Sequence, residues 1–118
     1  MRVMKLAVIG SGMIVNEFLS IVPYLNNIKI NGIYGRKKSY EKLNKIKKQN
    51  NIKNIFYNYE ELLKSDINTV YIGLPNNLHF EFSKKALEAN KNVIVEKPIT
   101  SNYKEAKILS DLARKRGL

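Results

Sequence analysis

Residues 5–15 read KLAVIGSGMIV, an apolar run that breaks at a glycine-serine-glycine turn and continues into a helical pattern. Lys5–Ile9 predicts a short strand, because a few consecutive apolar residues that end at a glycine are typical of a buried strand. Residues 13–22 predict a helix, with apolar residues at helical spacing: Ile14, Phe18 and Val22. A strand, a tight turn and a helix in this order indicate a fold that alternates strands and helices.

The same alternation continues along the chain. Apolar runs predict further strands at residues 28–34, 55–57, 69–74 and 92–95. Helical patterns predict further helices at residues 39–49, 59–64 and 79–90, and a last one between residues 102 and 117. Right-handed crossovers between such strands produce a parallel sheet with helices on both faces. We therefore expect one doubly wound α/β domain over residues 1–118, with the strand order 3-2-1-4-5.

Local signals mark the ends and the inner faces of these helices. The expected end signals are an N-cap at Ser39, a left-handed residue at Asn90, a capping box of Asn102 and Glu105, and a stop at Gly117. The side chains expected to face the sheet are Tyr40, Leu43, Ile46, His79, Phe82, Ala86, Ala106, Leu109 and Ala113.

Composition narrows the class of protein. A chain of 118 residues can bury one core, and with no cysteine it has neither a disulfide framework nor a thiolate metal site, so we expect no metal. No apolar run reaches the ~20 residues of a membrane helix, and the N-terminal run lacks a signal-peptide cleavage site, so we expect a cytoplasmic protein that binds no membrane. The formal charge of +11 admits an anionic partner such as nucleic acid. A solvated lysine-rich surface is favoured, because only Lys45, Lys47 and Lys48 form a compact cluster.

The glycine turn has the form of a phosphate-binding turn. Gly10 permits the tight turn, and Gly12 lets the backbone approach a pyrophosphate at the N-terminus of the following helix. The residues expected to form this part of a dinucleotide site are Gly10, Ser11, Gly12, Met13 and Ile14. The third position of the fingerprint is Val15 instead of glycine or alanine, which implies either a wider helix–strand approach or a compensating small neighbour. The alternative is a plain tight turn in another doubly wound protein.

The end of the second strand bears on the choice between NADP and NAD. NAD-binding domains place an acid there, which accepts the ribose hydroxyls and repels a 2′-phosphate. This chain has Gly35, Arg36 and Lys37 instead: Gly35 leaves room, and Arg36 can pair with a phosphate or stack on the adenine. We therefore favour NADP over NAD, with a solvated basic turn as the alternative.

These motifs together resemble the N-terminal domain of the glucose–fructose oxidoreductase/inositol dehydrogenase/MocA (Gfo/Idh/MocA) family. The resemblance covers essentially the whole chain. It rests on the glycine turn, on the Gly35-Arg36 pair, and on residues 68–98, NTVYIGLPNNLHFEFSKKALEANKNVIVEKP. In that stretch Pro75-Asn76 and His79 match the family's Pro-Asn-x-x-His pattern, and residues 96–98 match its Glu-Lys-Pro. The resemblance implies a Rossmann fold and an oxidoreductase that uses a nicotinamide cofactor.

The resemblance also implies roles for residues after the fourth and fifth strands, where ligands bind in open α/β sheets. Lys97 corresponds to the family's active-site lysine, which can stabilise an oxyanion or assist proton transfer; the alternative is a surface lysine. The residues expected on the cofactor side are Gly73, Leu74, Pro75, Asn76, His79, Glu96, Lys97 and Pro98. His79 is expected to make a structural hydrogen bond rather than to act in catalysis. Pro98 would follow either a cis or a trans peptide bond.

The family's second domain, which holds the substrate, is not among these residues. We expect the chain to bind NADP or NAD as part of an oxidoreductase acting on a sugar, a polyol or a related small hydroxy compound, and to be inactive alone. Oligomers are possible for the intact protein. The alternatives are a non-catalytic dinucleotide sensor and, with less support, a basic nucleic-acid-binding domain, for which the chain lacks a recognition-helix signature.

Overall fold

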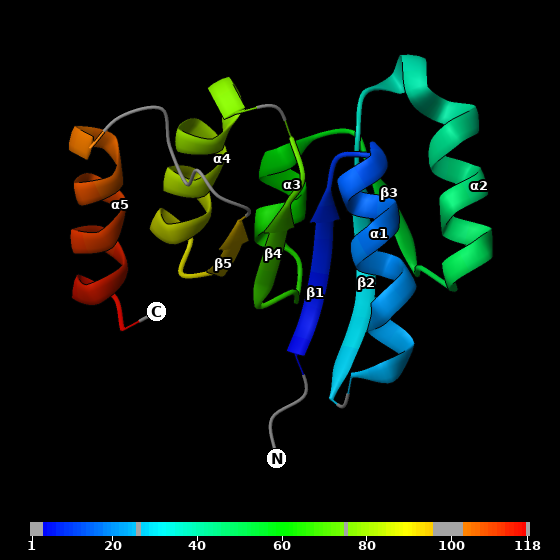
Figure 1. The fold of residues 1–118 in the computed structure, drawn as a ribbon, viewed down its shortest axis with the longest axis horizontal. Helices are drawn as coiled ribbons and strands as arrows, with labels where there is room; N and C mark the ends of the chain where they lie inside the picture. Colours follow the sequence, from blue (N-terminus) through cyan, green and yellow to red (C-terminus); the bar gives the residue numbers. More distant parts are fainter. Residues whose placement is uncertain (1–3, 26, 75, 96–102, 118) are drawn as a thin grey trace.

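A computed structural model describes residues 4–25, 27–74, 76–95 and 103–117 (Figure 1). Within these residues the strands form one five-stranded sheet in the order β3-β2-β1-β4-β5, and each neighbouring pair is parallel. The strands are β1 (Met4–Ile9), β2 (Ile28–Tyr34), β3 (Asn54–Phe56), β4 (Thr69–Ile72) and β5 (Asn92–Val95). The α-helices are α1 (Met13–Ile21), α2 (Tyr40–Asn50), α3 (Tyr59–Lys64), α4 (Asn76–Glu88) and α5 (Tyr103–Lys115), with short 3-10 turns η1 (Val22–Tyr24) and η2 (Lys37–Ser39). The predicted fold class and strand order are confirmed.

Successive side chains of a strand point to opposite faces of the sheet, and helices cover both faces, so side chains on both are buried. In β1, Leu6 and Val8 belong to a core cluster with residues of α1 and α2, whereas Ala7 and Ile9 belong to a second cluster with residues of α3 and α4. All four of these side chains are fully buried. This double burial explains why the central strand is an uninterrupted apolar run.

Asparagines end two of the helices in the left-handed conformation. Asn51 follows α2 with φ 54°, and Asn90 lies two residues after α4 with φ 62°. Gly117 follows α5 with φ 71°. The expectations for Asn90 and Gly117 are confirmed, because asparagine and glycine are the residues that best tolerate this backbone region.

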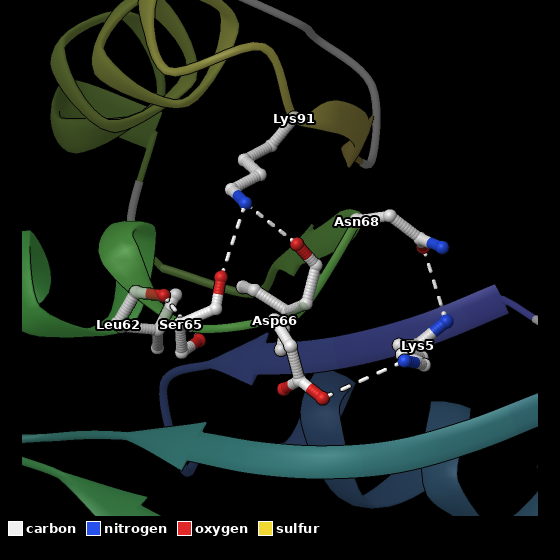
Figure 2. A network of polar contacts seen from close by, with 7 residues as sticks. Lys5, Leu62, Ser65, Asp66, Asn68 and Lys91 are labelled. Carbon is white, nitrogen blue, oxygen red and sulfur yellow. Dashed lines mark hydrogen bonds and ion pairs between the residues drawn. The ribbon is translucent and has the colours of Figure 1, made fainter.

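A polar network holds the loop before β4 at the amino-terminal edge of the sheet (Figure 2). The Lys91 ammonium donates to the carbonyl oxygens of Ser65 and Ile67, at 3.3 and 2.7 Å. The Lys5 backbone amide donates to the Asn68 side-chain oxygen at 3.0 Å. These contacts connect β1, the loop after α3 and the start of β5, so they fasten the two halves of the sheet together.

The predicted helices are present, but one side chain that was expected to face the sheet is exposed. In α1 the buried side chains are Val15 and Leu19, Phe18 is half-buried against the core, and Ile14 is 44% exposed. In α2, Leu43 and Ile46 are buried as predicted, but Tyr40 is 59% exposed. Tyr40 is the first residue of α2, where the helix only begins to approach the sheet.

The structure tests some of the other expectations for helix ends and buried helix residues. Ser39 does precede α2, but its side chain makes no capping hydrogen bond. In α4, His79 and Ala86 are buried and Phe82 is half-buried, and in α5, which packs against α4, Leu109 is buried. Asn102 and the side chains of Glu105 and Ala106 lie outside the described residues. Among the helices that the structure describes, none is both long and apolar enough to cross a bilayer.

Candidate functional site

The carboxyl-terminal edge of the sheet brings the predicted site residues together. Backbone hydrogen bonds beyond the strand ends fix this edge: Gly10 N to Tyr34 O at 2.9 Å, Gly73 N to Ile9 O at 2.9 Å, and Gly35 N to Phe56 O at 3.2 Å. They connect the ends of β1, β2, β3 and β4, which is the edge where open parallel sheets bind their ligands. The turns that follow these strands are therefore connected along one edge of the sheet, and we call this edge the rim.

Gly10 makes the turn that sequence predicted. Its φ is +114°, a conformation that residues with a side chain rarely adopt, and a Cβ there would lie 2.8 Å from the Gly73 carbonyl oxygen. Both the backbone conformation and the neighbouring strand therefore require glycine at this position.

Gly12 opens onto free space at the start of α1. It precedes the helix with an ordinary φ of −84°, and a Cβ on it would meet no atom within 4 Å. It provides no side-chain cap, and the described first turn of α1 carries no acidic residue. The first amides of α1 therefore face outward with the positive end of the helix dipole, as an anionic pyrophosphate requires. Ser11 is half-buried beside this opening, and Met13 and Ile14 are exposed.

Val15 and Gly73 explain the departure from the third glycine of the fingerprint. Val15 is fully buried, and a Cβ on Gly73 would lie 2.5 Å from its Cγ2 atom. Of the two alternatives that the sequence left open, the structure thus shows the compensating small neighbour, which is Gly73. Its lack of a side chain is required by the packing of α1 on β4, in addition to any role beside a ligand.

The turn after β2 presents basic side chains at the same rim. Gly35 is half-buried, while Arg36 and Lys37 are exposed, and η2 begins at Lys37. The first acidic residue after β2 is Glu41, inside α2. The turn therefore has cations that can pair with a phosphate and lacks the carboxylate that would repel one.

His79 fastens the loop between β4 and α4. Its side chain is 3% exposed, and its Nε2 atom lies 2.7 Å from the Leu74 carbonyl oxygen. Because a carbonyl only accepts, Nε2 carries the proton in this bond. The structural hydrogen bond predicted for His79 is confirmed, and it holds Leu74 at the rim.

Several predicted site residues lie outside the described part of the chain: Pro75, Glu96, Lys97 and Pro98. Asn76 begins α4, but its side chain is not described. The catalytic assignment of Lys97 and the isomer of the bond before Pro98 therefore stay predictions.

An aromatic cluster below the rim was not predicted from sequence. Tyr34, Tyr59 and Phe82 come from β2, α3 and α4, with the Tyr34 and Tyr59 ring centroids 5.5 Å apart. The Tyr59 hydroxyl donates to the Phe82 carbonyl oxygen at 2.9 Å. Burial, with a smaller contribution from Tyr34, raises the pKa of Tyr59 well above its usual value. Tyr34 ends β2, Tyr59 begins α3 and Phe82 lies in the middle of α4, and sequence spacing does not show that these residues meet.

Comparison with known proteins agrees with this arrangement. The GFO_IDH_MocA family model, described as an oxidoreductase family with an NAD-binding Rossmann fold, matches residues 4–118. An uncharacterized oxidoreductase of Schizosaccharomyces pombe is 36% identical over 123 residues, which is 100% of this chain and 32% of that protein. The scyllo-inositol 2-dehydrogenase (NADP(+)) IolU of Bacillus subtilis is 30% identical, over 97% of this chain and 34% of its own length.

A solved structure shows the same fold. KijD10, a 3-ketoreductase from Actinomadura kijaniata in complex with NADP and TDP-benzene, matches with a TM-score of 0.90 and 28% identity. The match covers 99% of this chain and 36% of that chain. The chain thus spans about a third of the length of the curated relatives that it matches.

Proposed function

Because this chain belongs to the Gfo/Idh/MocA family of oxidoreductases and forms its NAD-binding Rossmann domain, we propose that it is the cofactor-binding part of a dehydrogenase or reductase that prefers NADP. The observation that carries the proposal is the open start of α1, where Gly12 gives no side-chain cap and a Cβ on it would meet no atom within 4 Å. A pyrophosphate fits there, because the first amides of α1 and the helix dipole both favour an anion.

The preference for NADP rests on the turn after β2. Arg36 and Lys37 are exposed at the rim, and a guanidinium can make a paired, charge-assisted contact with a 2′-phosphate. Two relatives support this choice by what they bind: IolU is named as an NADP(+) enzyme, and KijD10 was crystallised with NADP. The same turn also tolerates NAD, since arginine can stack on adenine without discriminating between the two cofactors.

The proposed reaction is hydride transfer to or from a carbinol carbon of a sugar, a polyol or a related hydroxy compound. A bound nicotinamide supplies the hydride chemistry. Lys97 is proposed, from the Glu-Lys-Pro motif, to hold or move the proton of the substrate oxygen. The substrate class follows from the names of IolU, an inositol dehydrogenase, and KijD10, a 3-ketoreductase.

Cofactor titration followed by nicotinamide fluorescence tests the proposal. NADPH should bind saturably and at least as tightly as NADH. Binding of neither cofactor would overturn the proposed function, whereas a clear preference for NADH would overturn only the choice of NADP. A gel shift with nucleic acid at physiological salt checks the lower-ranked alternative, since that class of binding is strongly salt-dependent.

A further inference from the structure

The backbone after β2 is held in place from both sides. The Tyr34 carbonyl accepts from the Gly10 amide at 2.9 Å, and the Gly35 amide donates to the Phe56 carbonyl at 3.2 Å. These bonds connect residues 34 and 35 to the ends of β1 and β3. The Cα of Gly35 therefore cannot shift without breaking hydrogen bonds to its neighbouring strands.

The space above Gly35 is filled by Leu43. A Cβ on Gly35 would lie 2.8 Å from both methyl carbons of Leu43 and 3.2 Å from its Cγ. Leu43 is fully buried on α2, in a core cluster with Ile33 and Ile46. These atoms are the end of a flexible side chain, so Leu43 would have to rotate to admit a Cβ at residue 35, and its burial in a close-packed cluster makes that rotation costly.

This packing concerns the position where NAD-selective domains have their acid. Residue 35 directly follows β2, where an aspartate or glutamate otherwise accepts the ribose hydroxyls. We propose that Leu43 restricts position 35: by filling the Cβ position of Gly35, it makes the fold intolerant of an acidic side chain there, so that a change of cofactor preference towards NAD requires substitution of both residues.

Leu43 acts differently from Arg36. Arg36 is exposed at the rim, where it can pair with a phosphate, whereas Leu43 is fully buried in the core. Leu43 therefore acts only on which side chain position 35 can accept. The inference rests on the proposed preference for NADP, but the packing that carries it can be measured without cofactor.

The first experiment tests the packing with single methyl groups. Gly35→Ala and Gly12→Ala each add a Cβ, but only the one at residue 35 meets Leu43, since nothing lies within 4 Å at residue 12. Gly35→Ala should lower the melting temperature by at least ~4 °C more than Gly12→Ala. Equal melting temperatures for the two variants would overturn the proposal, because position 35 would then be open.

The second experiment tests selectivity with Gly35→Asp, Leu43→Ala and the double variant. Gly35→Asp alone should melt lower and gain no affinity for NADH. The double variant should melt higher than Gly35→Asp, because Leu43→Ala removes the colliding methyl groups. The ratio of its NADPH and NADH dissociation constants should move at least about tenfold towards NADH, as expected for charge-assisted hydrogen bonds gained by a new acid. If Leu43 did not restrict position 35, Gly35→Asp alone would shift this ratio as far as the double variant does.

The outcomes distinguish a failure of the proposed function from a failure of the inference about Leu43. If the unchanged protein binds neither cofactor, the proposed function fails, while the alanine comparison still reports on the packing. If it prefers NADPH but Gly35→Asp alone melts normally and already binds NADH, Leu43 does not restrict position 35 and the inference fails. An unshifted ratio in a folded double variant also overturns it. Should the double variant not fold, equal melting of the two alanine variants remains the overturning result.

Discussion

At the residue scale, the glycines of the rim are needed for different physical reasons. Gly12 faces open space and leaves room for a ligand, whereas Gly35 and Gly73 leave room for Leu43 and Val15 of the protein itself. A glycine motif alone does not reveal which reason applies. The distinction matters for mutagenesis, because a side chain at the first kind of position affects binding and one at the second kind affects folding.

Gly12→Val should abolish dinucleotide binding and leave the fold intact. A side chain at this position meets no protein atom but occupies the space in front of the amides of α1. The cost to stability should stay near ~1 kcal/mol, the penalty of a poorer N-cap residue. Circular dichroism checks the fold and fluorescence titration the binding. Normal binding by a folded Gly12→Val variant would place the site elsewhere.

Arg36→Ala should weaken NADPH binding selectively, by about 1–3 kcal/mol, because a charge-assisted contact with the 2′-phosphate is lost. NADH affinity should change much less. Calorimetry with both cofactors measures the difference, and Lys64→Ala on α3 is the control that removes the same charge elsewhere. Equal losses for the two cofactors would show that Arg36 stacks on the adenine and does not read the phosphate.

At the element scale, single side chains connect elements that are distant in sequence. Tyr59 at the start of α3 bonds to a carbonyl of α4, and Lys91 before β5 bonds to carbonyls of the loop before β4. The first contact joins α3 to α4, and the second joins the residue before β5 to the loop before β4. His79 adds a contact between α4 and Leu74, just after β4.

Tyr59 should make the protein sensitive to alkaline pH. Its pKa is raised above 10.0 in the folded protein, so the folded state keeps the hydroxyl proton while the unfolded state loses it. Stability is therefore fully present below pH ~10 and falls above it, by up to ~1.4 kcal/mol per pH unit from this group. Urea unfolding of the unchanged protein and of Tyr59→Phe, measured between about pH 8 and 11, isolates the effect. The variant should lose less stability than the unchanged protein as the pH rises. Parallel pH profiles would contradict this role.

Lys91→Met should destabilise the protein by about 1–3 kcal/mol, since two half-buried carbonyls lose a charged donor while the aliphatic length is retained. Equilibrium unfolding in urea measures the loss. Lys45→Met, at an exposed position of α2, controls for the loss of a charge. A loss no greater than that of the control would mean that the Lys91 contacts add nothing in solution.

At the scale of the whole molecule, we propose that the domain offers one wall of a reaction site. The rim of β1, β2 and β4 holds the turns that suit a dinucleotide, and the relatives that share this fold are about three times as long. Catalysis requires the reacting atoms to be held ~3–3.5 Å apart, which contacts on both sides of the substrate provide.

These 118 residues alone should bind cofactor and show no turnover. Without a positioned substrate, the reaction forfeits about 7–11 kcal/mol of barrier reduction from orientation. Assays with a panel of sugars and polyols at saturating NADP or NAD should give no reduction, while NADPH titration in the same preparation shows that the site is intact. Steady turnover that disappears in Lys97→Ala would contradict the prediction and locate a substrate site within these residues.

The sequence by itself determined the order of elements, the parallel sheet and the edge at which the site lies. Periodicity and glycine placement are local properties, and a doubly wound sheet follows from their alternation. At Val15 the sequence left two alternatives open, a wider helix–strand approach or a small neighbour, and the structure shows the small neighbour to be Gly73.

Only the tertiary structure decided which side chains meet. Val15 is buried while Ile14 beside it is exposed, and Tyr40 is exposed although it was expected to face the sheet, because the rotation of a helix is set by the neighbour it packs against. The contact of Leu43 with Gly35, and that of Val15 with Gly73, join residues whose approach depends on strand register and helix docking. These contacts depend on long-range packing, which local sequence patterns do not specify.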